Sequence, residues 1–304
     1  MEHVEEAGVH SGDSACVVPP PTLPEEIIRR IVDSTERLAR SLAVRGLLNI
    51  QFAVKGDDVF VLEANPRASR TVPFISKATE VPLAKVATRV MMGETLADLR
   101  AAGVIPQHRL VPDYVAVKEA VLPWSRFPGE DTVLGPEMRA TGEVMGIGPH
   151  VGVAYAKALL AAGHEVPTRG TLFLSLADRD KAAGVEVART FSSVGFRILA
   201  THGTAGHLAR NGIGATHVDK VGEGPYDPIR LIEDGEINLV VNTPRGRRAR
   251  GDGGLIRRAA NRHGVACATT VQGGMAIAHS LQAGGEAVTA VRSLQAHHQA
   301  ARRG

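Results

Sequence analysis

The sequence has few cysteines and few aromatic residues, and both shortages restrict the kind of protein it encodes. Of its 304 residues only Cys16 and Cys267 are cysteines, which excludes a disulfide-stabilised scaffold and favours a reducing compartment. Aromatic side chains make up 4% of the chain, so its core must be built mainly from Val, Leu, Ile and Ala. A charge excess is missing as well: 35 Lys and Arg against 32 Asp and Glu give a net charge of +3, too small to indicate a nucleic-acid partner.

Long apolar runs are also missing. No run reaches the ~18 residues that a transmembrane helix needs, and the acidic start, Met1-Glu2-His3-Val4-Glu5-Glu6, lacks the apolar core of a signal peptide. These absences predict a cytoplasmic protein with no membrane partner.

Common cofactor motifs are absent too. The chain has no Gly-x-x-x-x-Gly-Lys-Ser/Thr loop, no Cys-x-x-Cys pair and no His-Glu-x-x-His, so a P-loop and a zinc site are not expected. The glycines of Gly146-Ile147-Gly148-Pro149-His150-Val151-Gly152 have one residue too many for a dinucleotide fingerprint and are predicted to form a loop.

The first half of the chain is predicted to be mixed α and β. Residues 2–7 are expected to end a helix before Gly8, and a Pro-rich loop follows at 17–21. A capping box, Thr22-Leu23-Pro24-Glu25, predicts a helix that stops at Gly46. Apolar runs at 47–54 and 59–64 around the turn 55–58 predict a β-hairpin. The remaining predictions are a helix at 82–92, a connecting segment at 95–150 with short strands near 114–122, and a helix at 153–162.

The second half alternates strands and helices, which indicates a parallel sheet covered on both faces. Strands are predicted at 172–176, 196–200, 217–221, 238–241 and 266–269, and helices at 180–194, 205–211, 228–234, 255–263 and 274–283. The length suggests about two domains at ~150 residues each. The predicted limits are 1–94, a connecting segment 95–163, and 164–304.

The hairpin carries the most informative polar residues. Gln51 lies in its first strand, and Glu63 and Asn65 end the second. A register that pairs Val54 with Phe60 would put Gln51 opposite Glu63, so three hard oxygen ligands suited to Mg²⁺ would meet at one end. Two arginines follow and suit phosphate oxygens, namely Arg67 and Arg70. The pattern alone fits an ordinary polar strand end somewhat better.

Longer strings change that balance, because they resemble the second ATP-grasp unit of the large subunit of carbamoyl phosphate synthetase. They are Glu5-Glu6-Ala7-Gly8-Val9-His10-Ser11-Gly12-Asp13-Ser14, Leu62-Glu63-Ala64-Asn65-Pro66-Arg67-Ala68-Ser69-Arg70-Thr71-Val72-Pro73-Phe74, Ser76-Lys77-Ala78-Thr79, Val117-Lys118-Glu119 and Gly135-Pro136-Glu137-Met138-Arg139-Ala140-Thr141-Gly142-Glu143. The resemblance implies an α/β chain: the C-terminal part of an ATP-grasp fold, α+β with an antiparallel hairpin, then a doubly wound parallel α/β domain.

The resemblance also implies roles for single residues. It implies ATP and Mg²⁺ or Mn²⁺ as cofactors and carbamate as substrate. The metal ligands would be Gln51, Glu63 and Asn65, and the ATP contacts Gly8, Val9, His10, Ser11, Gln51 and Glu63. Arg67 and Arg70 would face the phosphates or carbamate, as catalytic residues. Glu5, Asp13 and Glu119 would hold the activator ornithine.

Residues 164–304 resemble the methylglyoxal synthase-like regulatory domain of the same subunit. There the turn Thr201-His202-Gly203-Thr204 opens a helix and forms an anion cradle. The implied nucleotide pocket, for UMP as inhibitor or IMP as activator, consists of Lys181, Thr201, His202, Gly203, Thr204, Lys220, Asn242 and Thr243. An Arg- and Gly-rich stretch at 245–254 departs from the family; it would form a mobile loop at the pocket mouth with Arg245, Arg247, Arg248 and Arg250.

The family's large subunit is several times longer, so the chain is expected to be a C-terminal section that needs the rest of the large subunit and the glutaminase small subunit. As an ATP-dependent ligase it would serve pyrimidine and arginine biosynthesis, and alone it would be inactive. A stand-alone nucleotide-sensing protein without catalysis remains the alternative. Methylglyoxal synthase is disfavoured, because Gly222-Glu223-Gly224-Pro225 stands where that enzyme has Gly-Gly-Asp. His297-His298 and Arg302-Arg303 are predicted to be solvated.

Overall fold

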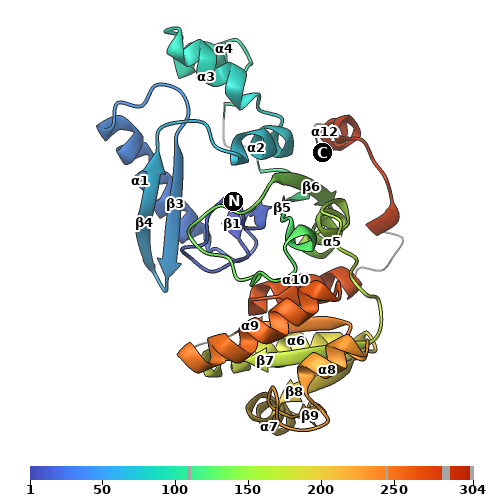
Figure 1. The fold of residues 1–304 in the computed structure, drawn as a ribbon. Helices are drawn as coiled ribbons and strands as arrows, with labels where there is room; N and C mark the ends of the chain where they lie inside the picture. Colours follow the sequence, from blue (N-terminus) through green and yellow to red (C-terminus); the bar gives the residue numbers. More distant parts are fainter. Residues whose placement is uncertain (108–110, 244–245, 283–287, 302–304) are drawn as a thin grey trace.

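The protein is described here by a computed structural model that covers residues 1–107, 111–243, 246–282 and 288–301 (Figure 1). Within these residues three sheets form: an antiparallel sheet in the order β1-β2-β5-β6, the hairpin β3-β4, and a parallel sheet in the order β11-β10-β7-β8-β9. In Figure 1 the hairpin stands to one side, the antiparallel sheet lies in the middle and the parallel sheet lies at the bottom. The predicted α/β class is confirmed. No helix among these residues is long and apolar enough to cross a membrane.

The start of the chain differs from its prediction. Glu2–His3 form β1, which pairs with β2 at Cys16–Val18, so the expected helix end at residues 2–7 is wrong. Helix α1 runs from Glu25 to Ser41, but its N-cap is Pro24 and no side chain caps it. The predicted capping box fails because the Thr22 N–H and hydroxyl both donate to the carboxylate of Glu2 instead.

The hairpin forms as predicted, with one correction to its register. Strand β3 spans Asn49–Lys55 and β4 spans Asp58–Asn65. Gln51 pairs with Glu63 as expected, but Val54 pairs with Val59 rather than Phe60. A bulge between Gln51 and Phe52 absorbs the difference, since it places an extra residue on one strand.

The middle of the chain is more regular than its sequence indicates. The predicted helix at 82–92 is α3, Leu83–Met91, and it is flanked by two short unpredicted helices: α2 at Thr71–Thr79 and α4 at Leu96–Ala101. Strand β5, Val115–Val121, confirms the strand predicted near 114–122. A 3₁₀ turn follows at Trp124–Arg126.

The glycine-rich stretch near residue 146 is a strand rather than a loop. Strand β6 runs from Gly142 to Gly148 and leads into α5, Val151–Ala161. A Cβ at Gly146 would lie 2.0 Å from the carbonyl oxygen of Ala154, and one at Gly152 would lie 2.5 Å from that of His279. These glycines therefore allow α5 to pack closely on its own strand and on α10, which explains them without a dinucleotide.

The parallel sheet confirms the alternation predicted for the second half. Its strands are β7 Thr171–Leu176, β8 Arg197–Thr201, β9 Thr216–Val218, β10 Leu239–Thr243 and β11 Ala266–Ala268. The helices are a 3₁₀ turn at Asp178–Asp180, α6 Lys181–Ser193, α7 His202–Arg210, α8 Pro228–Glu233, α9 Gly246–Arg262 and α10 Val271–Gln282. Chain order reverses between β7 and β10, the topological switch point at which such sheets bind ligands.

Helix α9 corrects the expected mobile loop at 245–254, because it begins at Gly246 rather than at 255. Arg245 and the side chains of Arg247, Arg248 and Arg250 lie outside the described residues.

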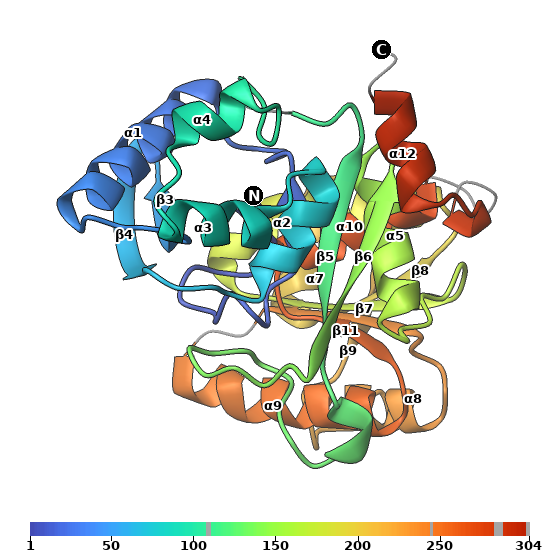
Figure 2. The ribbon, with the colours of Figure 1, turned by 90° about the horizontal axis from the view of Figure 1, so that it is seen from above.

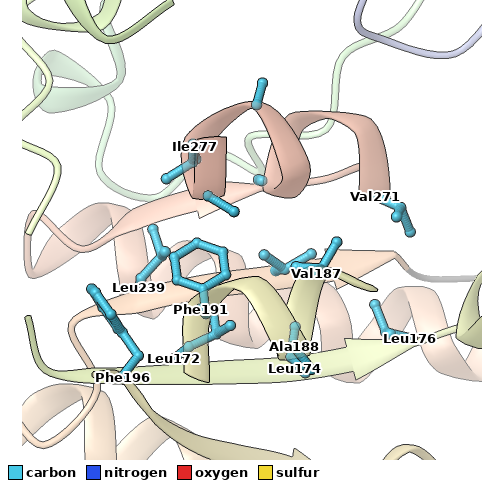
Figure 3. Packing of buried hydrophobic residues seen from close by; sticks show 14 of the residues in the cluster. Leu172, Leu174, Leu176, Val187, Ala188, Phe191, Phe196, Leu239, Val271 and Ile277 are labelled. Carbon is cyan, nitrogen blue, oxygen red and sulfur yellow. The ribbon is translucent and has the colours of Figure 1, made fainter. Parts of the chain in front are cut away.

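Alternate residues of β7 serve two cores. Leu172 and Leu174 face α6, where Val187 and Phe191 meet them (Figure 3), whereas Phe173 packs toward α8 and α9. The first core continues through α10 and α5, which lie beside β5 and β6 (Figure 2), to residues of the antiparallel sheet, including Val17 and Val117. The two larger sheets therefore share one core. The domain limits predicted at 94 and 163 stay a prediction.

The last helix packs back on the first half of the chain. In α12, Leu294–Ala301, the His297 ring meets Tyr114 edge-on at 5.7 Å, and a ring nitrogen of His298 lies 2.7 Å from the Lys77 carbonyl oxygen. The prediction that both histidines are solvated is wrong, because α12 covers the end of α2. Arg302 and Arg303 lie outside the described residues.

Phe191→Ala is expected to destabilise the shared core strongly. Phe191 is fully buried and meets Phe196 edge-to-face at 5.2 Å. Truncation of a buried Phe costs about 3–5 kcal/mol of unfolding free energy through lost transfer energy and the cavity left behind. Urea unfolding followed by circular dichroism measures the change. Phe127→Ala is the matched control, because Phe127 is 55% exposed and should cost about 1 kcal/mol or less. Equal costs would contradict the assigned core.

Candidate functional site

The hairpin gathers amide and carboxylate groups on one face. Gln51 pairs with Glu63 and Asn49 with Asn65, and residues two apart on a strand share a face, so all four side chains project together. The Asn49 amide donates to the Thr71 hydroxyl at the start of α2, over 3.3 Å. The structure therefore brings the three predicted metal ligands, Gln51, Glu63 and Asn65, onto one face.

The loop predicted to contact ATP lies directly against this face. The Gln51 amide nitrogen donates to the carbonyl oxygen of Val9 at 3.1 Å. Gly8 adopts φ +98°, a conformation that favours glycine, and the His10 N–H bonds the Gly135 carbonyl at 2.8 Å. Loop 8–11 and the hairpin, more than forty residues apart in sequence, thus form one surface.

The donor chemistry of this face fits a hard divalent cation. Because the Gln51 nitrogen is committed to Val9, its amide oxygen remains as an acceptor beside the exposed Glu63 carboxylate. One carboxylate and two amide oxygens suit Mg²⁺, which shares its shell with water and phosphate. In the described part of the chain no three His, Cys, Asp or Glu residues gather to hold a metal by themselves.

The two predicted arginines occupy different places. Arg67 lines a hollow of about 810 Å³ together with Asn49, Gln51 and Ser69. Arg70 precedes α2 and donates to the Ala140 carbonyl at 2.9 Å. This hydrogen bond ties the start of α2 to the backbone just before β6. Arg67 is thus the arginine with access to the hollow.

A second cluster is acidic and buried. The Oε2 atoms of Glu5 and Glu119 are shielded from solvent and have no hydrogen-bond partner among the described residues. Burial raises the pKa of Glu5 to about 7. Burial and the neighbouring Glu5 raise the pKa of Glu119 to about 8. Two buried carboxyl groups with unsatisfied oxygens form a site that a cationic ligand would complete.

Asp13 has a different task from this pair. Its two carboxylate oxygens accept the backbone N–H groups of Arg139 and Ala140 at 2.7 and 2.8 Å. It lies on the loop whose Ser11 and Gly12 carbonyls accept the buried ammonium of Lys118, at 3.1 and 3.3 Å. Of the three residues assigned to ornithine, Glu5 and Glu119 thus influence each other electrostatically, and Asp13 accepts hydrogen bonds from the backbone of residues 139 and 140.

The predicted effector residues gather at the carboxyl edge of the parallel sheet. The Thr204 hydroxyl accepts the Leu176 N–H at the end of β7 at 3.2 Å, and the Thr243 hydroxyl accepts the Ala177 N–H at 3.1 Å. The Lys181 ammonium lies 3.1 Å from where a Cβ of Gly203 would be, so the glycine leaves it room beside the turn. Thr201 is the N-cap residue of α7.

Two members of that set are more open to solvent. The Lys220 side chain is 78% exposed and lies 4.0 Å from the Glu223 carboxylate. His202 is exposed and stacks edge-on with His217 at 5.1 Å. Lys181 is therefore the lysine that the structure holds against the turn.

Sequence reasoning missed the residue that anchors Asn242. The Arg257 side chain is 1% exposed and donates to the Asn242 Oδ1 atom at 3.1 Å, while two of its nitrogens bind the Asp131 carboxylate at 2.6 Å each. In the sequence Arg257 stands beside Arg258 on a helix, a pattern typical of a solvated face. Arg257 is buried because residues 122–141 pack against α9, and this packing is visible only in the structure.

Two family descriptions match separate parts of the chain. Residues 1–99 match "Carbamoyl-phosphate synthase L chain, ATP binding domain", and residues 183–269 match "MGS-like domain". The chain thus matches an ATP-binding domain family of the carbamoyl phosphate synthase type in its first third and an MGS-like domain family in its second half.

Curated relatives make this assignment more specific. The carbamoyl phosphate synthase large chain of Rubrobacter xylanophilus is 54% identical over 93% of this chain and 26% of its own length. That of Archaeoglobus fulgidus is 52% identical over 98% of this chain and 27% of its own length. The "Carbamoyl phosphate synthase large chain, C-terminal section" of Methanocaldococcus jannaschii is 50% identical over 93% of this chain and 47% of its own length.

The chain is therefore related to the carbamoyl phosphate synthase large chains and matches their C-terminal section, as the sequence strings predicted. It spans about a quarter of the length of the full-length relatives. Among solved structures, the biotin carboxylase domain of a single-chain bacterial carboxylase matches 49% of this chain and 38% of its own length, at 21% identity and with a TM-score of 0.36.

Proposed function

We propose that this chain supplies a carbamoyl phosphate synthase large chain with the hairpin half of the site where ATP phosphorylates carbamate, and with an effector-binding domain. The observation that carries the proposal is the hydrogen bond from Gln51 to the Val9 carbonyl, which joins the ligand-bearing hairpin to the glycine loop. The family match over residues 1–99 to an ATP-binding domain supports it. The rest of the large chain and a glutaminase subunit would be the partners.

Catalysis at such a site is electrostatic, because phosphoryl transfer needs positioning and charge neutralisation rather than a covalent nucleophile. Gln51, Glu63 and Asn65 would hold Mg²⁺ or Mn²⁺, which neutralises phosphate oxygens when bound. Arg67, which lines a hollow together with Gln51, would pair with a phosphate or carbamate oxygen. Arg70 would hold the start of α2 against the backbone that precedes β6 through its bond to Ala140.

The effector proposal rests on the carboxyl edge of the parallel sheet. Lys181 beside Gly203 offers a positive charge, and Thr201 begins a helix whose first N–H groups suit a phosphate. Asn242 and Thr243 end β10, which lies beside β7 across the switch point and is separated from β8 by β7. A nucleoside monophosphate such as UMP or IMP would place its phosphate at the turn and its base nearer Asn242.

Ornithine is the proposed ligand of the buried acidic pair. Its side-chain ammonium would supply the donors that the Glu5 and Glu119 Oε2 atoms lack. Thr269, Thr270 and Arg139 line the adjoining hollow of about 650 Å³ with Glu5, and they would receive the amino-acid end.

Saturating UMP or IMP is expected to stabilise the wild-type chain. At about 100 times Kd a ligand that binds only the native state adds about 2.7 kcal/mol of unfolding free energy. Lys181→Ala should weaken nucleotide binding by about 1–3 kcal/mol, the range for a lost charge-assisted hydrogen bond, and Lys220→Ala by less because that side chain is more exposed. Calorimetric titration measures all three proteins, with Lys85→Ala on α3 as the control. If neither UMP nor IMP binds at millimolar concentration, the effector assignment is contradicted.

A further inference from the structure

The ion pair between Asp131 and Arg257 connects two regions that the proposed function keeps separate. Arg257 lies on α9 and is fully buried. Its Nε and Nη2 atoms donate to the Asp131 carboxylate, and its Nη1 atom donates to Asn242 at the end of β10. The bidentate geometry fixes the plane of the guanidinium. The Asp131 carboxylate thereby holds Arg257, and Arg257 holds Asn242.

This arrangement sets which end of the Asn242 amide a ligand meets. A guanidinium has donors only, so the Asn242 oxygen must face Arg257. What Asn242 can offer to a ligand is then its Nδ2 hydrogens, which suit an acceptor such as a base carbonyl or a ribose oxygen. Arg257 is a positioning residue: it orients the Asn242 amide and is not part of the turn at residues 201–204 where the phosphate would bind.

Asp131 belongs to a segment whose far end contacts the loop predicted to bind ATP. We name residues 122–141 the strap. The Gly135 carbonyl accepts the His10 N–H at 2.8 Å. The Arg139 and Ala140 N–H groups donate to Asp13. Near the start of the strap, the Trp124 carbonyl accepts a hydrogen bond from Asn261 on α9 at 3.3 Å. The strap thus runs from α9 to the loop that carries Val9.

Helix α9 is shaped to admit the Asp131 carboxylate. A Cβ at Gly254 would lie 3.1 Å from the Asp131 Oδ2 atom and 3.7 Å from the Arg257 Nη2 atom, whereas a Cβ at Gly251 on the same helix would meet nothing within 4 Å. Gly254 therefore leaves space for the ion pair, which a larger residue would crowd.

We propose that the Asp131–Arg257 ion pair couples the effector pocket to the nucleotide loop: a nucleotide bound at Asn242 steadies Arg257, Asp131 and the strap, and through the strap the loop at residues 8–13. The inference rests on the proposed effector site. Coupling between two sites is typically 5- to 150-fold in affinity. Breaking the pair should weaken nucleotide binding because it releases Arg257 and with it Asn242; Asp131 itself lines the hollow that Thr243 also reaches.

The test uses the whole chain, with UMP and IMP as probes in calorimetric titrations and in hydrogen-exchange mass spectrometry. In the wild type, bound nucleotide is expected to slow amide exchange in residues 122–141 and 5–13. Asp131→Asn should weaken nucleotide binding about tenfold and abolish the slowed exchange in the strap. Glu137→Gln, which removes an exposed charge of the same strap outside both hollows, should change neither.

A second pair of variants covers the case in which Asp131→Asn fails to fold. Gly254→Ala should weaken nucleotide binding and strap protection, while Gly251→Ala should leave both unchanged, although both replace a helical glycine with a better helix former. Wild-type affinity and strap protection in the folded Asp131→Asn and Gly254→Ala chains would overturn the coupling and leave the effector site intact. If the wild type binds neither nucleotide, the effector function fails, and the ion pair is reduced to a structural contact.

Discussion

Replacing Glu63 by Gln is expected to slow carbamate phosphorylation by roughly 100- to 1,000-fold, the loss typical of removing one group that stabilises transition-state charge. The substitution keeps the shape of the side chain and its place opposite Gln51 but removes the only carboxylate of the ligand set. The assay is ATP formation from carbamoyl phosphate and ADP, the reverse of the proposed step. It is performed in a hybrid in which this chain replaces the aligned part of the Rubrobacter xylanophilus large chain.

Asp58→Asn is the matched control for that experiment. Asp58 begins the same strand and is exposed, but it lies at the turn end of the hairpin, opposite Lys55. It should leave the rate unchanged. Glu63→Gln should also raise the Mn²⁺ or Mg²⁺ concentration needed for half-maximal rate. A Glu63→Gln hybrid with wild-type rate and metal dependence would remove Glu63 from the site.

Ornithine affinity is expected to rise steeply as pH increases from 6 to 8.5. The buried Glu5 and Glu119 carboxyls have pKa values raised to about 7 and about 8, so they are largely protonated at pH 6. An ammonium ligand needs them ionised, so binding releases protons. Titration calorimetry in buffers of different ionisation enthalpy measures both affinity and proton release.

The same two carboxyls set the pH dependence of the ligand-free chain. A carboxyl whose pKa is raised by folding stabilises the native state most below its unfolded pKa. That stability is lost as pH rises through the folded value. The free chain should therefore lose stability between about pH 4.5 and pH 8, and ornithine should restore it at the upper end.

Glu119→Gln separates the acidic pair from other titrating groups. It should lower ornithine affinity at pH 8 by about 2 kcal/mol or more, roughly 30-fold, because a buried charge partner is lost. It should also remove one released proton. Glu137→Gln, an exposed carboxylate, should alter neither. Ornithine binding that is independent of pH and unchanged in Glu119→Gln would place the activator elsewhere or nowhere in this chain.

The parallel sheet could be predicted almost completely from the sequence, because each strand is a short apolar run and each helix follows it directly. The Gln51–Glu63 pairing was also predictable, since the period of two leaves few registers. The exact partner of Val54 was not, because a bulge depends on local backbone geometry that the residue pattern does not encode.

The antiparallel sheet was the largest omission. Strand β2 pairs with β5 about a hundred residues later, and nothing near Cys16 in the sequence indicates that partner. Strand β6 was hidden by its glycines, which serve close packing against α5 rather than a turn. Long-range pairing and close approach are tertiary properties, so local propensity could not reveal either.

The candidate site divides in the same way. The residues that resemble family motifs were found, and the structure joins Gln51 to Val9, and separately places Glu5 near Glu119, in ways that the sequence could not show. The residues that connect these places, Lys118, Asp131 and Arg257, were missed. Charged residues are normally exposed, and only tertiary contacts can hold a lysine or arginine in the interior.

The central claim is that this chain contributes one half of a carbamate-phosphorylating site, and one measurement tests it most directly. The hybrid large chain described above is assayed for incorporation of labelled bicarbonate into carbamoyl phosphate with ATP and ammonia, beside the isolated chain at the same concentration. The hybrid is predicted to make carbamoyl phosphate, and the isolated chain to make none. A hybrid that folds, binds UMP and ornithine, and yet makes no carbamoyl phosphate would contradict the account and leave a binding protein without catalysis.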